Sequence, residues 1–460
     1  MSYLKLATEK ILVGDNSPQS VFSVLRNNYS VLLESSKDGR YSYVVYDPFL
    51  VVWRKKHVTQ SQVLKEFFDI KKKGDGGIVE DGESWFVEEV LKKFEQKMDG
   101  PVPFCGGAVG YLSYDYGVEL TGVDQQVFDD VQIPDYSFGF YDKVIAFDHE
   151  TGVMHMLALA ESDLKAERKI EEIKNEMTGE GGLIRKGEIG DIESNLSKES
   201  YLEKIEKVKE YLKDGETYQV NFSQRFKAKS TLDGFKVYKK MTRDNPTPYA
   251  CYFKYPDFEI VSCSPELLIK KEGASLESWP IKGTVERKKN KNADDYQARK
   301  LLNDKKIDAE LSMIVDLVRN DLGIISEIGS VEVKEHKALQ YLSHVIHTFS
   351  KIGSQVRKGV SVFEILKAMF PGGSITGCPK KRTVEIIDKL EDFKRGVYTG
   401  SAGFIGFNGE MEFNILIRTL LLKDNYAFFG AGGGIVVDSD GQSEYEETIN
   451  KVKVIFESLK

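Results

Sequence analysis

Apolar residues in the first 160 positions fall in short runs and alternations, the pattern that is typical of β-strands. In 41–54, Val, Tyr, Phe and Leu are broken by turn residues, and 143–159 predicts two strands joined across residues 149–152. Between these runs, 66–73 and 84–98 have the spacing of amphipathic helices. The first part of the chain is therefore predicted to be strand-rich with two helices.

A polar, glycine-rich segment from about residue 175 to 200 interrupts this pattern. It lacks hydrophobic periodicity, which predicts a boundary between folded units. We therefore expect an N-terminal domain over 1–175, a linker over 176–197 and a second domain over 198–460.

The second domain mixes helices with strands. Ser200 and Glu203 form a capping-box pair, an apolar stripe runs from Leu202 to Leu212, and Gly215 ends the helix. The strand-like run 400–437 has short turns at 407–410 and 423–425, which imply antiparallel pairing. This order predicts an α+β fold, with further strands at 217–226 and 251–263 and helices at 308–322, 362–370, 379–391 and 444–460.

Composition narrows the class of protein. The chain has 460 residues, 41% of them hydrophobic and 30% charged, which excludes global disorder. Its net charge of −8 (64 basic against 72 acidic residues) argues against nucleic acid or an anionic membrane as the main partner. An anionic ligand must then be held by local positive groups.

Cysteine usage and the N-terminus indicate a cytoplasmic location. None of the four cysteines lies in a C-x-x-C pair, which argues against a disulfide framework and a structural zinc site. The N-terminus lacks an apolar core of signal-peptide length, and no apolar run approaches the ~20 residues of a membrane helix.

Carboxylates share a helix face with apolar residues in two segments. Glu310 aligns with Ile314 and Leu317 in one, and Glu444, Glu447 and Lys451 share a face of the last helix. Two such helices could give oxygen ligands to one Mg²⁺ ion. Alternatively, Glu447 and Lys451 form an ordinary i,i+4 pair and Glu310 sits near a helix start, and spacing alone favours this second interpretation.

Two glycine-rich segments, 371–381 and 430–441, expose backbone N–H groups that can bind carboxylates or phosphates. Neither matches a phosphate-binding P-loop or a dinucleotide fingerprint, so a nucleotide fold is disfavoured. Taken alone, such segments are more often simple turns.

Three side chains stay ambiguous on pattern alone. Lys282 follows apolar Ile281 and precedes a Gly-Thr turn, so it is either a solvated lysine, which spacing favours, or an amine beside an apolar site. His347 is either a core histidine or part of a site. Arg418 either caps a strand or clamps a carboxylate.

In order along the chain, these segments resemble the chorismate-utilising enzymes. The similarity begins at LLES (32–35) and GGAVGYLSYD (106–115) and covers nearly all of 198–458. PIKGT with Lys282, together with GGSITG with Ser374, is most similar to aminodeoxychorismate synthase component I, and anthranilate synthase component I is the next candidate. The other motifs are DAELSMIVDLVRNDLG, YLSHVIHTFS, FPGGSITGCPKKR, RGVYTGSAGFIG, FNILIRT, GAGGGIVVDSD and EYEETINK.

The resemblance implies a fold and a binding site for chorismate. The fold is two large antiparallel β-sheets packed face to face with helices outside. Glu310 and Glu447 match magnesium ligands, with Glu444 acting through water, and the ion would hold the ring carboxylate. The other positions that match substrate-binding residues are Gly283, Thr284, His347, Tyr398, Arg418, Gly432, Gly433, Gly434 and Lys451.

The resemblance also implies a reaction. Lys282 would attack C2 of the ring as the C4 hydroxyl leaves, and ammonia would then enter at C4 and expel the lysine. Glu266 matches the general acid for the hydroxyl, although Ser-Pro-Glu taken alone reads as a strand-to-turn transition. The product would be 4-amino-4-deoxychorismate, the precursor of p-aminobenzoate.

Partners follow from the same resemblance. The sequence contains no amidotransferase module, which implies a separate glutaminase subunit that supplies ammonia. Leu33, Glu34 and Ser35 resemble a tryptophan pocket, unless they are only a Leu-rich strand with a polar end. A chorismate- or tryptophan-binding subunit without activity is the remaining alternative, and the retention of Glu310, Glu447, Arg418 and Lys451 counts against it.

Overall fold

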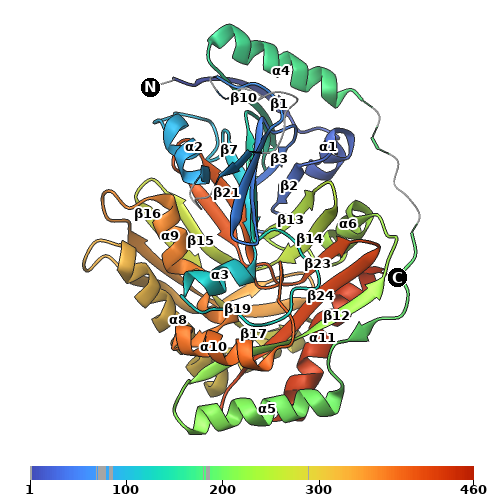
Figure 1. The fold of residues 1–460 in the computed structure, drawn as a ribbon, viewed down its shortest axis with the longest axis vertical. Helices are drawn as coiled ribbons and strands as arrows, with labels where there is room; N and C mark the ends of the chain where they lie inside the picture. The colour runs from blue at the N-terminus through green and yellow to red at the C-terminus, as the bar shows by residue number, and fades with distance from the viewer. Residues whose placement is uncertain are drawn as a thin grey trace.

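The computed structural model describes residues 3–68, 70, 79–81, 86–179, 181–182, 187–288 and 290–459. Two large sheets of antiparallel strands form its centre (Figure 1). Along the first sheet the order is β1 (Lys5–Leu12), β10 (Val153–Ala160), β9 (Lys143–Asp148), β3 (Tyr41–Val45), β2 (Ser30–Glu34), β13 (Tyr249–Lys254), β14 (Phe258–Ser264), β23 (Thr419–Lys423), β24 (Tyr426–Ile435), β12 (Gln219–Lys229) and β11 (Glu193–Ser194), and β20 (Gly377–Cys378) also pairs with β12.

The second sheet has the same size among the described residues, 12 strands. Its order is β17 (Ile281–Glu286), β19 (Val345–Gln355), β16 (Ser275–Trp279), β15 (Leu267–Glu272), β22 (Met411–Asn414), β21 (Ser401–Gly406), β7 (Gly107–Leu112), β8 (Tyr136–Tyr141), β4 (Leu50–Lys55), β5 (Val58–Val63) and β6 (Val79–Asp81), and β18 (Glu332–Tyr341) also pairs with β19.

Helices cover the outer face of each sheet. The first sheet carries α1 (Pro18–Leu25), α4 (Asp163–Met177), α5 (Lys198–Lys213), α6 (Gly234–Asp244), α10 (Lys380–Leu390) and α11 (Gly441–Leu459). The second carries α2 (Phe86–Phe94), α7 (Lys291–Asn303), α8 (Lys305–Ile325) and α9 (Val362–Met369), while α3 (Tyr114–Leu120) follows β7 and the 3₁₀ turn η1 (Gly373–Ile375) contacts α8. Figure 1 places α4 at one end of the long axis and α5 at the other.

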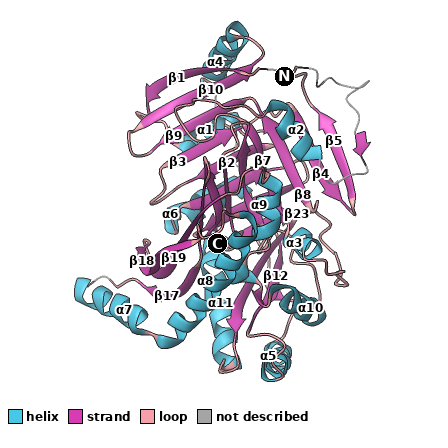
Figure 2. Cartoon of the chain, turned by 90° about the vertical axis from the view of Figure 1, so that its left-hand side faces the viewer, coloured by secondary structure: helices cyan, strands magenta, loops and turns pink. Residues whose placement is uncertain are grey.

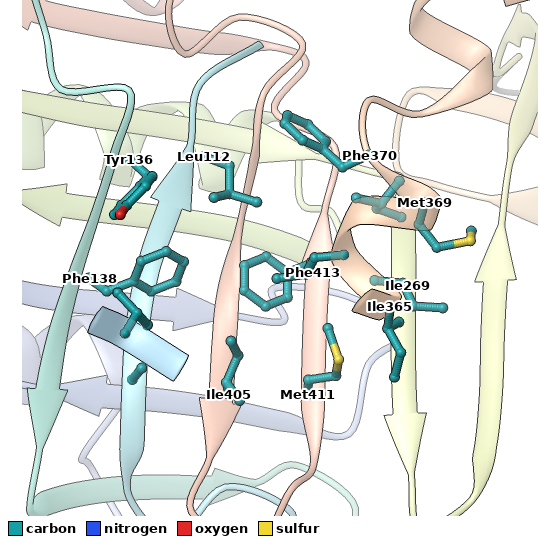
Figure 3. Packing of buried hydrophobic residues seen from close by; sticks show 14 of the residues in the cluster. Leu112, Tyr136, Phe138, Ile269, Ile365, Met369, Phe370, Ile405, Met411 and Phe413 are labelled. Carbon is teal, nitrogen blue, oxygen red and sulfur yellow. The ribbon is translucent and has the colours of Figure 1, made fainter. Parts of the chain in front are cut away.

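Three apolar clusters hold these layers together. One lies between the sheets and joins Tyr43 of β3 and Phe253 of β13 to Tyr111 of β7 and Phe404 of β21. A second fills the space between the first sheet and its helices. The third lies between the second sheet and its helices, where Ile365 and Met369 of α9 pack over the strands that carry Ile269, Met411 and Phe413 (Figure 3). The expected α+β fold, two antiparallel sheets face to face with helices outside, is confirmed.

Strands from both sides of the expected domain boundary pair within each sheet. β2 pairs with β13 in the first sheet, and β7 pairs with β21 in the second. The expected linker, 176–197, begins at the end of α4 and includes β11, while residues 180 and 183–186 lie outside the described part. The division into domains stays a prediction.

Several local predictions need correction. Residues 66–68 and 70 are not helical, because Phe68 has a φ of 53° and Phe67 pairs with Ile70 in an isolated antiparallel bridge; residues 69 and 71–73 lie outside the described part. The run 41–54 forms two strands, β3 and β4, which belong to different sheets. The expected helix 84–98 is shorter, as α2, with residues 84–85 outside the described part.

The start of α5 also differs from the prediction. Ser197, rather than Ser200, is the N-cap, because the Ser197 side chain accepts a hydrogen bond from the backbone N–H of Ser200. Two serines three residues apart can each cap a helix, and the fold selects the earlier one. Of the helices in the described residues, none is long and apolar enough to cross a lipid bilayer.

Candidate active site

Lys282 is placed by a β-bulge in β17. Opposite β19, Lys282 pairs with Thr348 and Thr284 pairs with His347, so Gly283 is an extra residue in the ladder. Gly283 has a φ of +77°, and a Cβ there would lie 2.7 Å from Ile307 of α8. A bulge re-aims the side chains on either side of it. Here the Lys282 Nζ points at α8 and lies 2.9 Å from an oxygen of Glu310.

Two helices that carry acidic side chains meet near Lys282. Glu310 is near the start of α8, and Glu444 and Glu447 are in the first turns of α11. The Nζ of Lys306 lies 3.8 Å from Glu310 and 4.0 Å from Glu444, so one ammonium group faces both helices. Figure 2 shows α8 and α11 overlapping in projection in the lower half of the molecule, and the contact between Lys306 and Glu444 joins their N-terminal turns. The carboxylates that the sequence placed on two separate helices therefore converge.

The glycines of β24 form the other side of the site. A Cβ on Gly434 would lie 2.7 Å from the Nζ of Lys282, and one on Gly433 would lie 3.0 Å from an oxygen of Glu444. Beyond Phe429, β24 is paired with β12 but no longer with β23. Alternate N–H groups of this stretch therefore face the site instead of a strand partner, which suits the binding of an anion.

Lys451 ties α11 to these glycines. Its Nζ donates to the carbonyl of Gly432 at 2.9 Å and lies 2.6 Å from Glu447. Burial raises the pKa of Glu447, but the Lys451 ammonium more than offsets this and the net shift is downward. Glu444 differs, since burial leaves the pKa of its carboxyl raised although Ser439 donates a hydrogen bond to it.

A hydrogen-bonded chain of three side chains crosses from the second sheet to the first. Thr284 Oγ1 lies 2.6 Å from Nδ1 of His347, and Nε2 of His347 lies 3.2 Å from Arg418. Burial, with Arg418 adding to it, lowers the pKa of His347 to about 3, so the imidazole is neutral. Arg418 can only donate, so Nε2 accepts and the ring proton lies on Nδ1, donating to Thr284.

Arg418 is a cation without an acidic partner. It adopts a left-handed conformation, with a φ of 52°, where the chain passes from β22 to β23. Burial lowers the pKa of its guanidinium, and no carboxylate among the described residues compensates for this. A half-buried guanidinium that has no acidic partner among the described residues is suited to an incoming anion.

Tyr398 packs against β24. A Cβ on Gly430 would lie 2.4 Å from the Tyr398 ring. Burial raises the pKa of its phenol above the ordinary range, so it remains a hydrogen-bond donor at neutral pH.

Glu266 lies where the chain crosses from β14 in the first sheet to β15 in the second. Its carboxyl is 3% exposed, and Oε1 has no hydrogen-bond partner among the described residues. Burial raises its pKa to about 7, with Ser374, the Ile281 backbone, Lys282 and Lys451 acting in the opposite direction. The acid is therefore close to both lysines of the site and holds a proton near neutrality. The segment is a transition between two strands, as its pattern alone suggests, and the role of Glu266 as general acid stays a prediction.

The residues of the expected tryptophan pocket form a separate cluster. Glu34 ends β2 and accepts hydrogen bonds from Gln19 and from the hydroxyl of Tyr238, 2.7 Å away. Ser35 accepts a hydrogen bond from the backbone N–H of Gly39, and Leu33 pairs with Cys251 of β13. A structural role for this segment is thus visible, and tryptophan binding stays a prediction.

Sequence reasoning missed two residues of the site. Lys306 was identifiable, because it precedes Glu310 by four residues on one helix. Gln219 starts β12, and its side chain lies beside Gly434 with an oxygen that lacks a partner in the described structure. Nothing in an alternating strand pattern distinguishes such a residue.

Metal ligation needs rearrangement of these side chains. In the described part of the chain, no three His, Cys, Asp or Glu side chains are close enough to form a complete cage. Glu310 and Glu444 share Lys306, and Glu447 binds Lys451. The donor chemistry nevertheless fits a hard divalent ion, because Mg²⁺ usually takes only one or two protein carboxylates and completes its shell with water and substrate.

Another cavity, of about 50 Å³, adjoins Tyr398. Gly430, Thr419 and Arg395 also line it, but Lys282, Glu266 and Glu310 do not. The candidate reactive centre therefore rests on the cluster of charged groups rather than on this cavity.

Known proteins resemble this chain over nearly its whole length. The sequence signature described as "chorismate binding enzyme" matches residues 30–457. Aminodeoxychorismate synthase component 1 of Bacillus subtilis (strain 168) is 36% identical over 437 residues, covering 92% of this chain and 90% of that protein. Anthranilate synthase component 1 of Acetivibrio thermocellus is 33% identical over 475 residues, covering 98% and 94%.

A solved structure supports the same fold. Anthranilate synthase component I from Streptococcus pneumoniae TIGR4 superposes with a TM-score of 0.80 at 29% identity, covering 97% of this chain and 99% of that one. Both named activities thus occur among similar proteins.

Proposed function

Because the chain belongs to the family of chorismate-binding enzymes, we propose that it is the chorismate-binding component of an aminodeoxychorismate synthase. The observation that carries this proposal is the position of Lys282, whose amine lies inside the acidic cluster, against Gly434 and near the buried acid Glu266. An amine there can form a covalent bond to the ring. An enzyme that adds ammonia directly to the ring does not need such an amine.

The two carboxylates of chorismate require two positive regions, and the chain offers both. Arg418, with Tyr398 beside it, would bind the enolpyruvyl carboxylate, since the guanidinium lacks an acidic partner among the described residues. The ring carboxylate would lie at the free edge of β24, near Gly432, Gly433 and Lys451. His347 and Thr284 would then line the ring, with neutral His347 keeping Arg418 oriented.

In the first chemical step, Lys282 attacks C2, the ring double bond shifts and the C4 hydroxyl leaves. Glu266 donates the proton that lets this hydroxyl depart as water. In the second step, ammonia adds at C4, the double bond shifts back and the Lys282 amine is released. The same lysine side chain thereby divides one difficult displacement into two steps.

We propose Mg²⁺ as the cofactor, held by Glu310 and Glu447 directly and by Glu444 through water. Bound there, the ion would supply positive charge to the ring carboxylate. Lys282 and Lys306 neutralise the same acids in its absence.

Ammonia is proposed to come from a separate glutaminase subunit, with free ammonium as a weaker substitute. The similar proteins are named as component 1 of their synthases, which agrees with a second component. A bound tryptophan near Leu33, Glu34 and Ser35 and a cytoplasmic location remain predictions from the sequence.

Anthranilate synthase component I is the second candidate, because the structural match and one relative of similar identity carry that name. Product identity separates the two. Incubation with chorismate, Mg²⁺ and ammonium is expected to give 4-amino-4-deoxychorismate, identified by mass and ultraviolet spectrum. Anthranilate would contradict the proposal and support the second candidate. Calorimetric chorismate binding without any product, even with a glutaminase added, would instead indicate a non-catalytic subunit.

A further inference from the structure

Behind Glu266 lies a second, smaller cavity that the proposed reaction does not use. It has room for about one water molecule, with a volume of about 10 Å³, and lies between α8, η1 and the start of β15. Its polar lining comes from Glu266, Ser278, Ser374 and Asp321, and Met369, whose packing Figure 3 shows, is among its apolar residues. The glycine-rich segment 371–381, which the proposed chemistry leaves without a role, thus forms one wall.

Two of these polar groups are not fully satisfied. Oε1 of Glu266 and Oγ of Ser374 are buried without a hydrogen bond of full geometry to any described residue, although Ser374 lies close enough to lower the pKa of Glu266. Buried polar groups are almost always satisfied by protein or by ordered water. A polar cavity with room for water and unsatisfied groups at its wall is therefore a hydrated one.

Asp321, which also lines this cavity, belongs to a charged pair with Lys380. Asp321 of α8 is 4% exposed and accepts a hydrogen bond from Lys380 at 2.7 Å. Lys380 is the first residue of α10, and its side chain is only partly buried. On its other side, Glu266 faces Lys282 and Lys451. Glu266 and Asp321 thus line one cavity, and the Lys380 partner of Asp321 is partly exposed to solvent.

The proton balance of the proposed reaction requires a path for protons from solvent. Glu266 gives one proton to the C4 hydroxyl, which leaves as water. Neutral ammonia then adds, the neutral Lys282 amine is expelled, and the product departs as an ammonium ion. Each cycle therefore leaves Glu266 as a carboxylate and needs one proton from solvent.

We propose that water in this cavity, with Asp321 and Lys380 beside it, returns the proton to Glu266 after each turnover. A cavity water gives a proton to the Glu266 carboxylate, and the water regains one from the Asp321–Lys380 pair, which exchanges with bulk solvent. Ser374 holds that water beside Glu266. Asp321 is thus a positioning residue for proton return, and this role rests on the proposed function.

Rapid-quench kinetics separate proton return from the chemical steps. With chorismate, Mg²⁺ and ammonium, Asp321→Asn is expected to form its first product at a rate within about twofold of wild type and then to slow about tenfold in later turnovers. Small weak acids such as formic acid should restore the later rate. Ser374→Ala is also expected to form its first product at nearly the wild-type rate and to slow in later turnovers, but by less than Asp321→Asn. If Asp321→Asn does not fold, the Ser374 variant tests the proton route.

Asp316→Asn is the matched control. Asp316 lies on the same helix, is 72% exposed and pairs with Arg319, so its variant should keep wild-type kinetics in both phases. The proton route would be overturned if the Asp321 and Ser374 variants slowed equally in the first and later turnovers. It would also be overturned if neither variant slowed. The product from wild type, read in the same samples, tests the proposed function separately, because a product other than aminodeoxychorismate contradicts that function alone.

Discussion

The Nζ of Lys282 lies 2.9 Å from a carboxylate oxygen of Glu310, so the proposed nucleophile is paired with a proposed metal ligand. Three carboxylates from two helices would repel one another if no cation lay between them. Lys282 and Lys306 supply that charge. If the proposed Mg²⁺ binds there, its binding and the release of the Lys282 amine from Glu310 would be linked.

Replacement of Lys282 tests the covalent step. Lys282→Ala is expected to lower turnover by more than about 1,000-fold, because no other amine is placed to form the ring bond, while the fold is retained. Turnover is measured by product formation, and folding by circular dichroism and thermal unfolding.

Lys351→Ala is its matched control. Lys351 is in the neighbouring strand β19, pairs with Glu277 at 3.2 Å and has a side chain 23% exposed, against 22% for Lys282. It should lose a similar ion pair and keep its activity. Comparable turnover in the two variants would exclude the covalent step.

Charge substitutions at the acidic cluster should change magnesium affinity in opposite directions. Glu310→Gln removes a ligand and is expected to weaken Mg²⁺ binding by about 10- to 100-fold. Lys306→Gln removes a competing ammonium and is expected to tighten it about threefold, a modest effect because this lysine is half exposed. Isothermal titration calorimetry without substrate measures both.

Glu457→Gln, on the exposed face of α11, controls for general charge effects, since Glu457 pairs loosely with Lys453. If Lys306→Gln and Glu310→Gln shift the affinity in the same direction, Lys306 does not occupy the space of the ion.

The pH dependence of turnover should follow Glu266. Burial raises its pKa to about 7, and the reaction uses the protonated form. Turnover limited by loss of the hydroxyl is therefore greatest below this pH and falls about tenfold for each unit above it. Glu266→Gln should lower turnover by about 100-fold or more and remove this basic limb.

Asp115→Asn provides the control for this profile. Asp115 is another buried acid, with a pKa that burial raises to about 6, but it lies on α3 outside the reactive cluster. Its variant should keep the basic limb. A wild-type profile that is flat between pH 6 and 9 would contradict the role of Glu266 as the acid.

Local sequence patterns predicted much of the framework. Apolar runs bounded by turn residues identified β9, β10 and the strands of 400–437, and these strands are largely buried on both faces. Periodicity of 3.6 put Glu310 in line with Ile314 and put Glu447 in line with Lys451, as the structure has them. Such patterns act over a few residues, and short-range sterics and burial are enough to produce them.

The sequence by itself therefore determined the element types, the faces that carry charge and, through ordered motifs, the family. Tertiary structure alone decided which elements meet: β3 and β4 separate into different sheets, Phe67 joins a bridge instead of a helix, Gln219 comes to lie beside Gly434, and Ser374 lines the cavity next to Glu266. It also decided that Glu266 is buried deeply enough to keep its proton, because desolvation depends on all the atoms packed around a carboxyl rather than on its neighbours in the chain.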